Sequence, residues 1–316
     1  MTENAASSQL RSATLVNPKA LMQLRNLELR ARVVVEGFWS GLHRSPYHGF
    51  SAEFTEYRQY SPGDDPRYLD WRVFARSDRY FLKKFEDETN LRCHVLFDQS
   101  RSMSYGSIGY TKETYAATLA ATLAYFLHLQ GDAIGLLTFD EAVREYLPAR
   151  HRVGHLRQIM LALEKPTGGR STNLAEPIGR LASLVRKRGL VAYISDFLAP
   201  IDRLEASLLT LTACGHEVSV FQVLDPAERT LNLDHAAVFE DIESANRVYI
   251  DPVEARRDYV LKIEAHCAAV RAMCQKLGID HQRISTDQPL ELALYEFMRE
   301  RLRRGRQIRA ATHHRP

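Results

Sequence analysis

The chain has 316 residues, of which 45% are hydrophobic and 26% are charged, a balance typical of a globular protein that buries a core without disulfide or metal support. Its net charge of +3 is too small to indicate nucleic-acid binding by itself. The four cysteines have no CxxC spacing, the start MTENAASSQL does not resemble a signal peptide, and no apolar run reaches the length of a membrane span. These features predict a soluble, cytoplasmic protein.

The first ninety residues predict helices and loops. We expect residues 1–16 to be disordered, and Asn17-Pro18 to start a helix because an N-cap residue is followed by proline. Apolar residues then recur at helical spacing as far as Phe38, and Gly37 and Gly41 are expected to end the helix. After a loop-rich stretch, we expect a short helix from Asp65 to about Ser77 and a strand within 79–85.

From residue 92 onward, apolar strands alternate with amphipathic helices. Strands are predicted at 92–97, 133–139, 142–147, 190–195, 217–223 and 280–284, and helices at about 111–129, 152–163, 203–214, 253–277 and from 288. A further helix is expected after the loop at 166–174, with Ile178, Leu181 and Val185 facing inward and Gly189 as its stop, and a short hairpin in a polar insertion at 225–251. Continuous apolar strands of this kind form a mostly parallel sheet that is covered on both faces. The predicted fold class is therefore α/β, doubly wound and Rossmann-like, with an N-terminal helical and loop-rich extension.

The domain organisation predicted from these patterns has four parts. They are a disordered N-terminus at 1–16, an N-terminal segment at 17–90 packed on the main domain, the main α/β domain at 91–300 with its insertion at 225–251, and a basic tail at 301–316.

Oxygen-bearing side chains follow three of the predicted elements at one edge of the sheet. Asp98, Ser100 and Ser102 come directly after the strand at 92–97, Thr172 lies in a glycine-rich loop, and Asp196 ends the strand at 190–195. Ligands gather at the carboxyl ends of strands in such sheets, and carboxylates with hydroxyls suit Mg²⁺ or Mn²⁺. Each motif alone is equally a turn or a helix cap, but together they predict a metal site. Its expected outer partners are Ser104, Asn173 and Ser195.

The same residues resemble the metal-ion-dependent adhesion site of von Willebrand factor A domains. The match consists of Asp98-x-Ser100-x-Ser102, Thr172 in GGRSTN and Asp196 in YISDF. The segment GFSAEFTEYRQYSPGDDPRYLDWRVFAR (49–76), with the later VLDPAE, FEDIES and RRDYV, resembles the bacterial "domain of unknown function 58" family over roughly residues 35–300.

This resemblance implies a von Willebrand factor A-like domain in which the five positions hold the metal ion and the ion grips an Asp or Glu of a partner. It also implies a MoxR-type AAA+ ATPase as partner, in a chaperone-like system that matures or assembles client proteins. Within 49–76, many charges of both signs surround Trp71. They predict an ion-pair lattice that pins the segment to the main domain, with a partner-binding face as the alternative.

Two other function classes compete with this interpretation. A Mg²⁺-dependent phosphatase of the haloacid-dehalogenase type would use Asp98 but needs a second acid at the position of Ser100, and PTGGRSTN lacks the GKS or GKT ending of an ATP-binding loop. Nucleic-acid binding would rest only on the arginines at 299, 301, 303, 304, 306 and 309, which a solvated helix end also explains. We therefore expect a metal-dependent adaptor that is not an enzyme, with no nucleic acid and no membrane span, and keep a Mg²⁺-dependent hydrolase as the alternative.

Overall fold

The computed structural model describes residues 15–43, 57–59, 81–83, 91–165, 175–185, 187–231, 237–240, 247–250 and 252–312. The contacts divide the chain into two compact units. One comprises the described residues of 1–44 and 91–316, and the other those of 45–90. The domain boundaries drawn from the sequence stay a prediction.

Two N-terminal helices replace the single helix expected from Asn17. Helix α2 spans Pro18–Met22 and α3 spans Leu27–His43. The break arises because Asn26 starts a new helix: its side-chain oxygen accepts a hydrogen bond from the backbone N–H of Leu29 at 2.8 Å. The expectation that Gly37 and Gly41 end the helix was wrong, since α3 runs through both. Its predicted apolar stripe is buried, and Phe38 packs edge-on against Phe126 at 5.8 Å between ring centroids.

The smaller unit is described only by a short hairpin. Strand β1, Tyr57–Gln59, pairs antiparallel with β2, Phe81–Lys83. The second strand lies within the predicted 79–85, whereas β1 was not predicted. The helix expected from Asp65, and Trp71 with its surrounding charges, lie outside the described residues.

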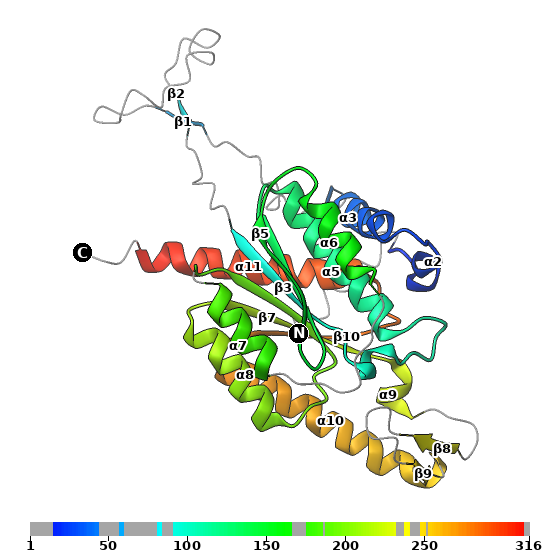
Figure 1. Cartoon of the computed structure of the whole chain (residues 1–316). Helices are drawn as coiled ribbons and strands as arrows, with labels where there is room; N and C mark the ends of the chain where they lie inside the picture. Colours follow the sequence, from blue (N-terminus) through cyan, green and yellow to red (C-terminus); the bar gives the residue numbers. More distant parts are fainter. Residues whose placement is uncertain are drawn as a thin grey trace. The chain divides into compact units, whose positions relative to one another are not determined.

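The larger unit is built on a six-stranded sheet with the order β10-β7-β6-β3-β4-β5 (Figure 1). The strands are β3 (Arg92–Asp98), β4 (Ala133–Phe139), β5 (Val143–Arg150), β6 (Leu190–Ser195), β7 (Glu217–Leu224) and β10 (Asp280–Ser285). Only β5 runs antiparallel to its neighbour in this sheet. Strands β3, β4, β6 and β7 are almost wholly buried, as expected for a parallel sheet covered on both faces. The predicted α/β fold class is confirmed.

Helices cover both faces of the sheet (Figure 1). They are α5 (Lys112–Leu129), α6 (His155–Leu163), α7 (Ala175–Leu184), α8 (Ile201–Ala213), α10 (Pro252–Lys276) and α11 (Leu290–Thr312). Helices α7, α8 and α10 share one apolar cluster with the sheet. On the other face, α5 is buried along most of its length, and Phe297 of α11 contacts Phe221 of β7 at 6.0 Å between ring centroids. A helix that is apolar all round is a core helix, which fixes α5 at the centre of this layer.

The insertion predicted at 225–251 contains a short helix and the expected hairpin. Helix α9 spans Pro226–Thr230, and strands β8 (Ala237–Glu240) and β9 (Arg247–Ile250) pair antiparallel. Asp225 caps α9 with a reciprocal pair of hydrogen bonds: it accepts from Ala227 N at 2.9 Å, and Glu228 accepts from Asp225 N at 2.9 Å.

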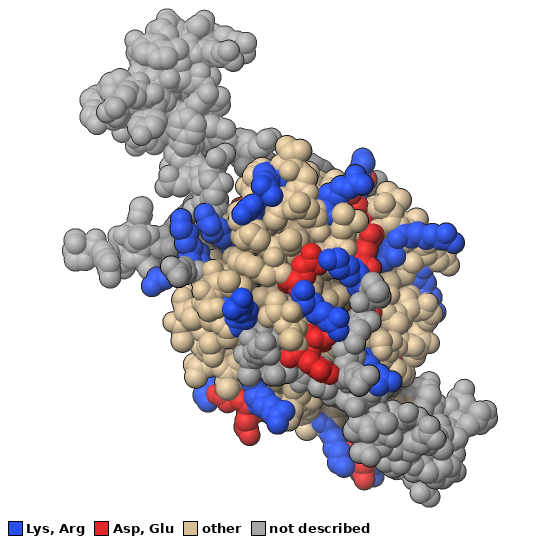
Figure 2. Space-filling model, viewed as in Figure 1, with Lys and Arg blue, Asp and Glu red and all other residues tan. Residues whose placement is uncertain are grey.

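The basic C-terminal segment is part of α11, which reaches Thr312. Arg301 donates to Asp132 at 3.1 Å and to Gln130 at 3.3 Å, and Arg304 pairs with Asp280 at 2.8 Å. These arginines attach α11 to the amino-terminal ends of the strands, which lie opposite the carboxyl ends where the site is predicted. Over the described part of the face in Figure 2, Lys and Arg side chains are scattered and interspersed with Asp and Glu. None of the described helices is long and apolar enough to span a membrane.

Candidate functional site

Asp98 is the centre of the predicted metal site, and it lies at the carboxyl end of β3 with 1% of its surface exposed. One carboxylate oxygen, Oδ1, accepts a hydrogen bond from the backbone N–H of Ser100 at 2.8 Å. The other, Oδ2, accepts one from the hydroxyl of Ser195 at 2.6 Å. A buried carboxylate needs such donors, and here they also hold it in one orientation at the edge of the sheet.

The serines after Asp98 begin a short 3₁₀ helix, η2, at Arg101–Ser104. Ser100 is fully buried at its N-cap position, and its hydroxyl lies 3.1 Å from the hydroxyl of Ser102. Ser104 does not join them, because its hydroxyl donates to the carbonyl of Arg101 at 2.6 Å. The tight turn thus presents two neighbouring hydroxyls beside Asp98, whereas Ser104 satisfies its own turn.

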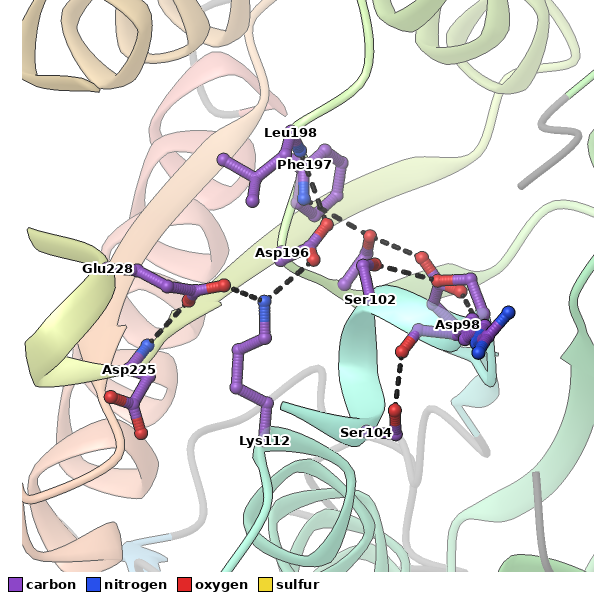
Figure 3. A network of polar contacts seen from close by, with 12 residues as sticks. Asp98, Ser102, Ser104, Lys112, Asp196, Phe197, Leu198, Asp225 and Glu228 are labelled. Atoms are coloured by element: carbon purple, nitrogen blue, oxygen red, sulfur yellow. Dashed lines mark hydrogen bonds and ion pairs between the residues drawn. The ribbon is translucent and has the colours of Figure 1, made fainter. Parts of the chain in front are cut away.

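Asp196 reaches the same place from the neighbouring strand, β6, where it follows Ser195 (Figure 3). Its side chain accepts a hydrogen bond from Leu198 N at 3.3 Å, and it is 4% exposed. The next residue, Phe197, has a φ of 55°, a left-handed conformation that is strained for a residue with a bulky side chain. Strain of this kind persists only where surrounding contacts hold it.

Two contacts from other elements hold the backbone of Asp196 and Phe197 in place. Gln222 of β7 donates to the backbone carbonyl of Asp196 at 3.1 Å. On the other side, the Nε2 atom of His266 in α10 lies 2.7 Å from the carbonyl oxygen of Phe197. The position of Asp196 is therefore fixed by β7 and α10 as well as by its own strand.

Of the five predicted ligands, four lie together: Asp98, Ser100, Ser102 and Asp196. Thr172, and with it Asn173, lies outside the described residues. The two described carboxylates are close enough for each to influence the charge of the other. The convergence expected of the loops after β3 and β6 is therefore present.

Lys112 is a residue of this site that the sequence analysis missed. It is the first residue of α5 and is fully buried, and its ammonium lies 2.8 Å from Oδ2 of Asp196 and 2.6 Å from Oε1 of Glu228 (Figure 3). A signal was available, because the positive end of a helix dipole disfavours lysine unless acidic partners are close. A lysine directly after the N-cap Thr111, at the sheet edge where acids gather, indicates such partners.

Electrostatics divide the acids into two kinds. Burial, and to a lesser extent repulsion by Asp196, raise the pKa of Asp98 to about 6, against the opposing effect of the hydrogen bonds from Ser195 and Ser100. Burial also raises the pKa of Asp196, but Lys112 and a hydrogen bond from Ser102 outweigh this effect and hold it below its ordinary value.

The partners of Asp196 follow the same rules. Burial raises the pKa of Glu228, and the attraction of Lys112 only partly offsets this effect. Burial lowers the pKa of Lys112, but Asp196 and Glu228 more than reverse this effect, so its pKa lies above the usual range. Lys112 is therefore a fixed positive charge between two acids, whereas none of the described groups that shift the pKa of Asp98 is a cation.

These residues fit a small, hard cation. Asp98 with the Ser100 and Ser102 hydroxyls offers oxygen atoms only, the donor type that Mg²⁺ and Mn²⁺ prefer. The carboxylates of Asp98 and Asp196 repel each other, and a bound cation would remove this repulsion. Within the described ranges, no group of three or more His, Cys, Asp or Glu side chains is placed to hold a metal ion. The oxygen-only donor set of Asp98, Ser100 and Ser102 suits Mg²⁺ or Mn²⁺ rather than zinc.

The comparisons with known proteins agree with the sequence resemblance. The chain matches the family described as "Protein of unknown function DUF58" over residues 56–269. A protein of Mycobacterium tuberculosis named "Uncharacterized protein Rv1480" is 31% identical over 316 residues, which cover 96% of this chain and 98% of that protein.

Solved structures resemble the chain at lower identity. The hypothetical protein BatB from Bacteroides thetaiotaomicron is 15% identical with a TM-score of 0.44, over 66% of this chain and 98% of that one. The VWA domain of SpRpn10 is 11% identical with a TM-score of 0.39, over 66% of this chain and 95% of that one. These similarities are too weak to assign a role to the site, whose chemistry is therefore inferred from the geometry of this chain alone.

Proposed function

The chain belongs to the family described as "Protein of unknown function DUF58", and we propose that it is a protein-binding module whose binding site contains a divalent cation at the carboxyl edge of the sheet. The observation that carries this proposal is the convergence of Asp98 and Asp196 from neighbouring strands beside the hydroxyls of Ser100 and Ser102. The proposed ion is Mg²⁺ or Mn²⁺. Thr172 completes the ligand set by resemblance to von Willebrand factor A domains.

Each described residue has a separate role in this proposal. Asp98 supplies the charge that holds the cation, and Ser100 and Ser102 supply neutral oxygens. Ser195 orients the Asp98 carboxylate through its hydrogen bond at 2.6 Å. Asp196, whose Oδ2 is already bonded to Lys112 at 2.8 Å, faces the ion with its charge partly compensated. When bound, the cation supplies an electrophilic position for a carboxylate of a partner protein.

The partner class follows from this chemistry and from the resemblance. An Asp or Glu side chain on a client protein or on a MoxR-type AAA+ ATPase is the ligand that such a cation attracts, in a chaperone-like maturation or assembly system of the cytoplasm. Nucleic acid is not part of the proposal, because the described arginines of α11 are engaged by Asp132, Asp280 and other acidic neighbours.

The described residues support a binding role over a hydrolase. Both carboxylate oxygens of Asp98 accept hydrogen bonds, which hold the group in one orientation, as a binding site requires. A haloacid-dehalogenase-type reaction also needs a second acid two residues later, where Ser100 stands.

The test combines ion affinity with partner capture. Asp98→Ala is expected to lose Mg²⁺ affinity, measured by calorimetry, and to lose Mg²⁺-dependent co-purification with the MoxR-type ATPase encoded by the same organism. Asp132→Asn is the matched control, because Asp132 is also a buried acid beside a strand of the sheet but lies at the opposite edge. Unchanged ion affinity and capture in the Asp98 variant contradict the proposal, and phosphatase activity that disappears in Asp98→Asn favours the hydrolase instead.

A further inference from the structure

Lys112 is unusual because it places a fully buried ammonium against a proposed metal ligand. Its side chain is 0% exposed and contacts Asp196 at 2.8 Å and Glu228 at 2.6 Å. A buried lysine is costly unless acids compensate it, so its position depends on these two carboxylates. Figure 3 shows its side chain rising from α5 between them.

Counted over the residues that the structure describes, the charges around the site do not balance without a further cation. Asp98, Asp196 and Glu228 carry three negative charges when ionised, and Lys112 returns one. The ammonium bonds to Asp196 and Glu228, whereas the donors to Asp98 are the neutral N–H of Ser100 and the neutral hydroxyl of Ser195. Among the described residues, the positive charge therefore lies on the Asp196 side of the site.

We propose that Lys112 is a specificity-determining residue that compensates Asp196, so that a bound divalent cation keeps positive charge and selects an acidic ligand on the partner. This inference rests on the proposed function and deepens it. With Asp196 compensated, a cation bound to Asp98 and neutral hydroxyls keeps about one positive charge. If both acids were free to neutralise it, the cation would bind more tightly and would attract a partner carboxylate less.

Glu228 competes with Asp196 for the positive charge of the Lys112 ammonium. One of its oxygens bonds to Lys112, and the other accepts the N–H of Asp225 in the cap of α9. Removal of the Glu228 charge therefore strengthens the pull of Lys112 on Asp196, while a glutamine retains an oxygen for the cap. Substitutions at Lys112 and at Glu228 therefore change the net charge beside Asp196 in opposite directions.

A charge series with Mn²⁺ as the probe tests this inference on the full chain. Lys112→Met is expected to tighten Mn²⁺ binding about tenfold or more, and Glu228→Gln to weaken it several-fold, since single buried charges change ion affinity by factors of this order. The double variant Lys112→Met with Glu228→Gln restores the charge balance and is expected to lie near the wild type. Calorimetry at fixed pH and salt gives the affinities.

A second readout measures how strongly the protein-bound Mn²⁺ binds a carboxylate ligand. Acetate that replaces a water on protein-bound Mn²⁺ lowers the water-proton relaxation rate. We expect this effect in the wild type and a several-fold weaker effect in Lys112→Met, because its ion is more fully neutralised.

The outcomes separate the two proposals. If the wild type and Asp98→Asn both fail to bind Mn²⁺, the proposed function fails. If the wild type binds Mn²⁺ and folded Lys112→Met binds with equal or lower affinity, the role given to Lys112 is overturned. Should Lys112→Met not fold, Glu228→Gln decides: weaker Mn²⁺ binding supports the inference, and unchanged affinity overturns it.

Discussion

Replacement of Lys112 by methionine tests how strongly the buried ammonium stabilises the fold. The substitution keeps an unbranched side chain but leaves Asp196 and Glu228 without the cation that they contact at 2.8 and 2.6 Å. Removal of one partner from a buried ion pair costs about 3–5 kcal/mol, because the remaining charges are desolvated and uncompensated. For a unit of this size, that loss lowers Tm by roughly 6–20 °C.

The assay is thermal and urea unfolding without divalent ions, with Lys276→Met as the matched control. Lys276 pairs with Glu205 at 2.6 Å, but its side chain is 70% exposed, so its loss is expected to cost at most about 1 kcal/mol. Glu228→Gln added to Lys112→Met is expected to recover part of the stability, since it removes one unpaired charge. A Lys112→Met protein as stable as the Lys276→Met protein would refute the assignment of Lys112 as a buried counter-cation.

Three further predictions concern the rest of the fold. Burial lowers the pKa of His94 from 6.5 to about 4. The unfolded chain therefore binds a proton that the folded chain does not, so this group is expected to lower stability by up to about 3 kcal/mol as pH drops from about 6.5 to about 4, and His94→Gln removes that part of the pH dependence in urea titrations. Leu208→Ala is expected to cost about 2–5 kcal/mol of unfolding free energy because Leu208 is fully buried. Leu209→Ala is the control: its side chain is 52% exposed, so its loss stays within about 0.5 kcal/mol. Equal losses in urea unfolding would contradict the assignment of Leu208 to the buried face of α8. Arg301→Met is expected to cost about 1–3 kcal/mol because its hydrogen bonds include one to a buried acid, against about 0–1 kcal/mol for the exposed Arg303→Met, and the reverse order in the same assay would return the arginines to a partner-binding role.

Most of the main sheet was predictable from the sequence for a simple physical reason. Strands such as AIGLLTF (133–139) and LVAYIS (190–195) are buried on both faces, so their sequence is continuously apolar and their ends are sharp. The carboxyl ends of such strands meet at one edge, which is why Asp98 and Asp196 were expected together.

The errors came from places where local signals compete. A single apolar stripe predicted one N-terminal helix, but the side chain of Asn26 caps a second start within it. Glycine usually indicates a helix end, yet Gly37 lies inside α3, where a Cβ atom would come within 3.3 Å of Glu291. There, glycine serves close packing instead of termination.

Lys112 was missed because its partners are far away in the chain. Asp196 and Glu228 follow it by 84 and 116 residues, so no spacing rule links them. Only the topology, which directs the start of α5 at the ends of β6 and β7, brings the three together. By contrast, Ser100 and Ser102 follow Asp98 within one turn, and their grouping was readable directly from DxSxS.

The most direct test of the proposed cation site is anomalous diffraction at the manganese edge from crystals of the full chain grown with Mn²⁺. We predict one strong peak in bonding contact with Asp98 and the hydroxyls of Ser100 and Ser102, on the side of Asp196 away from Lys112. A map without a peak there, or with manganese only at other positions, would contradict the account.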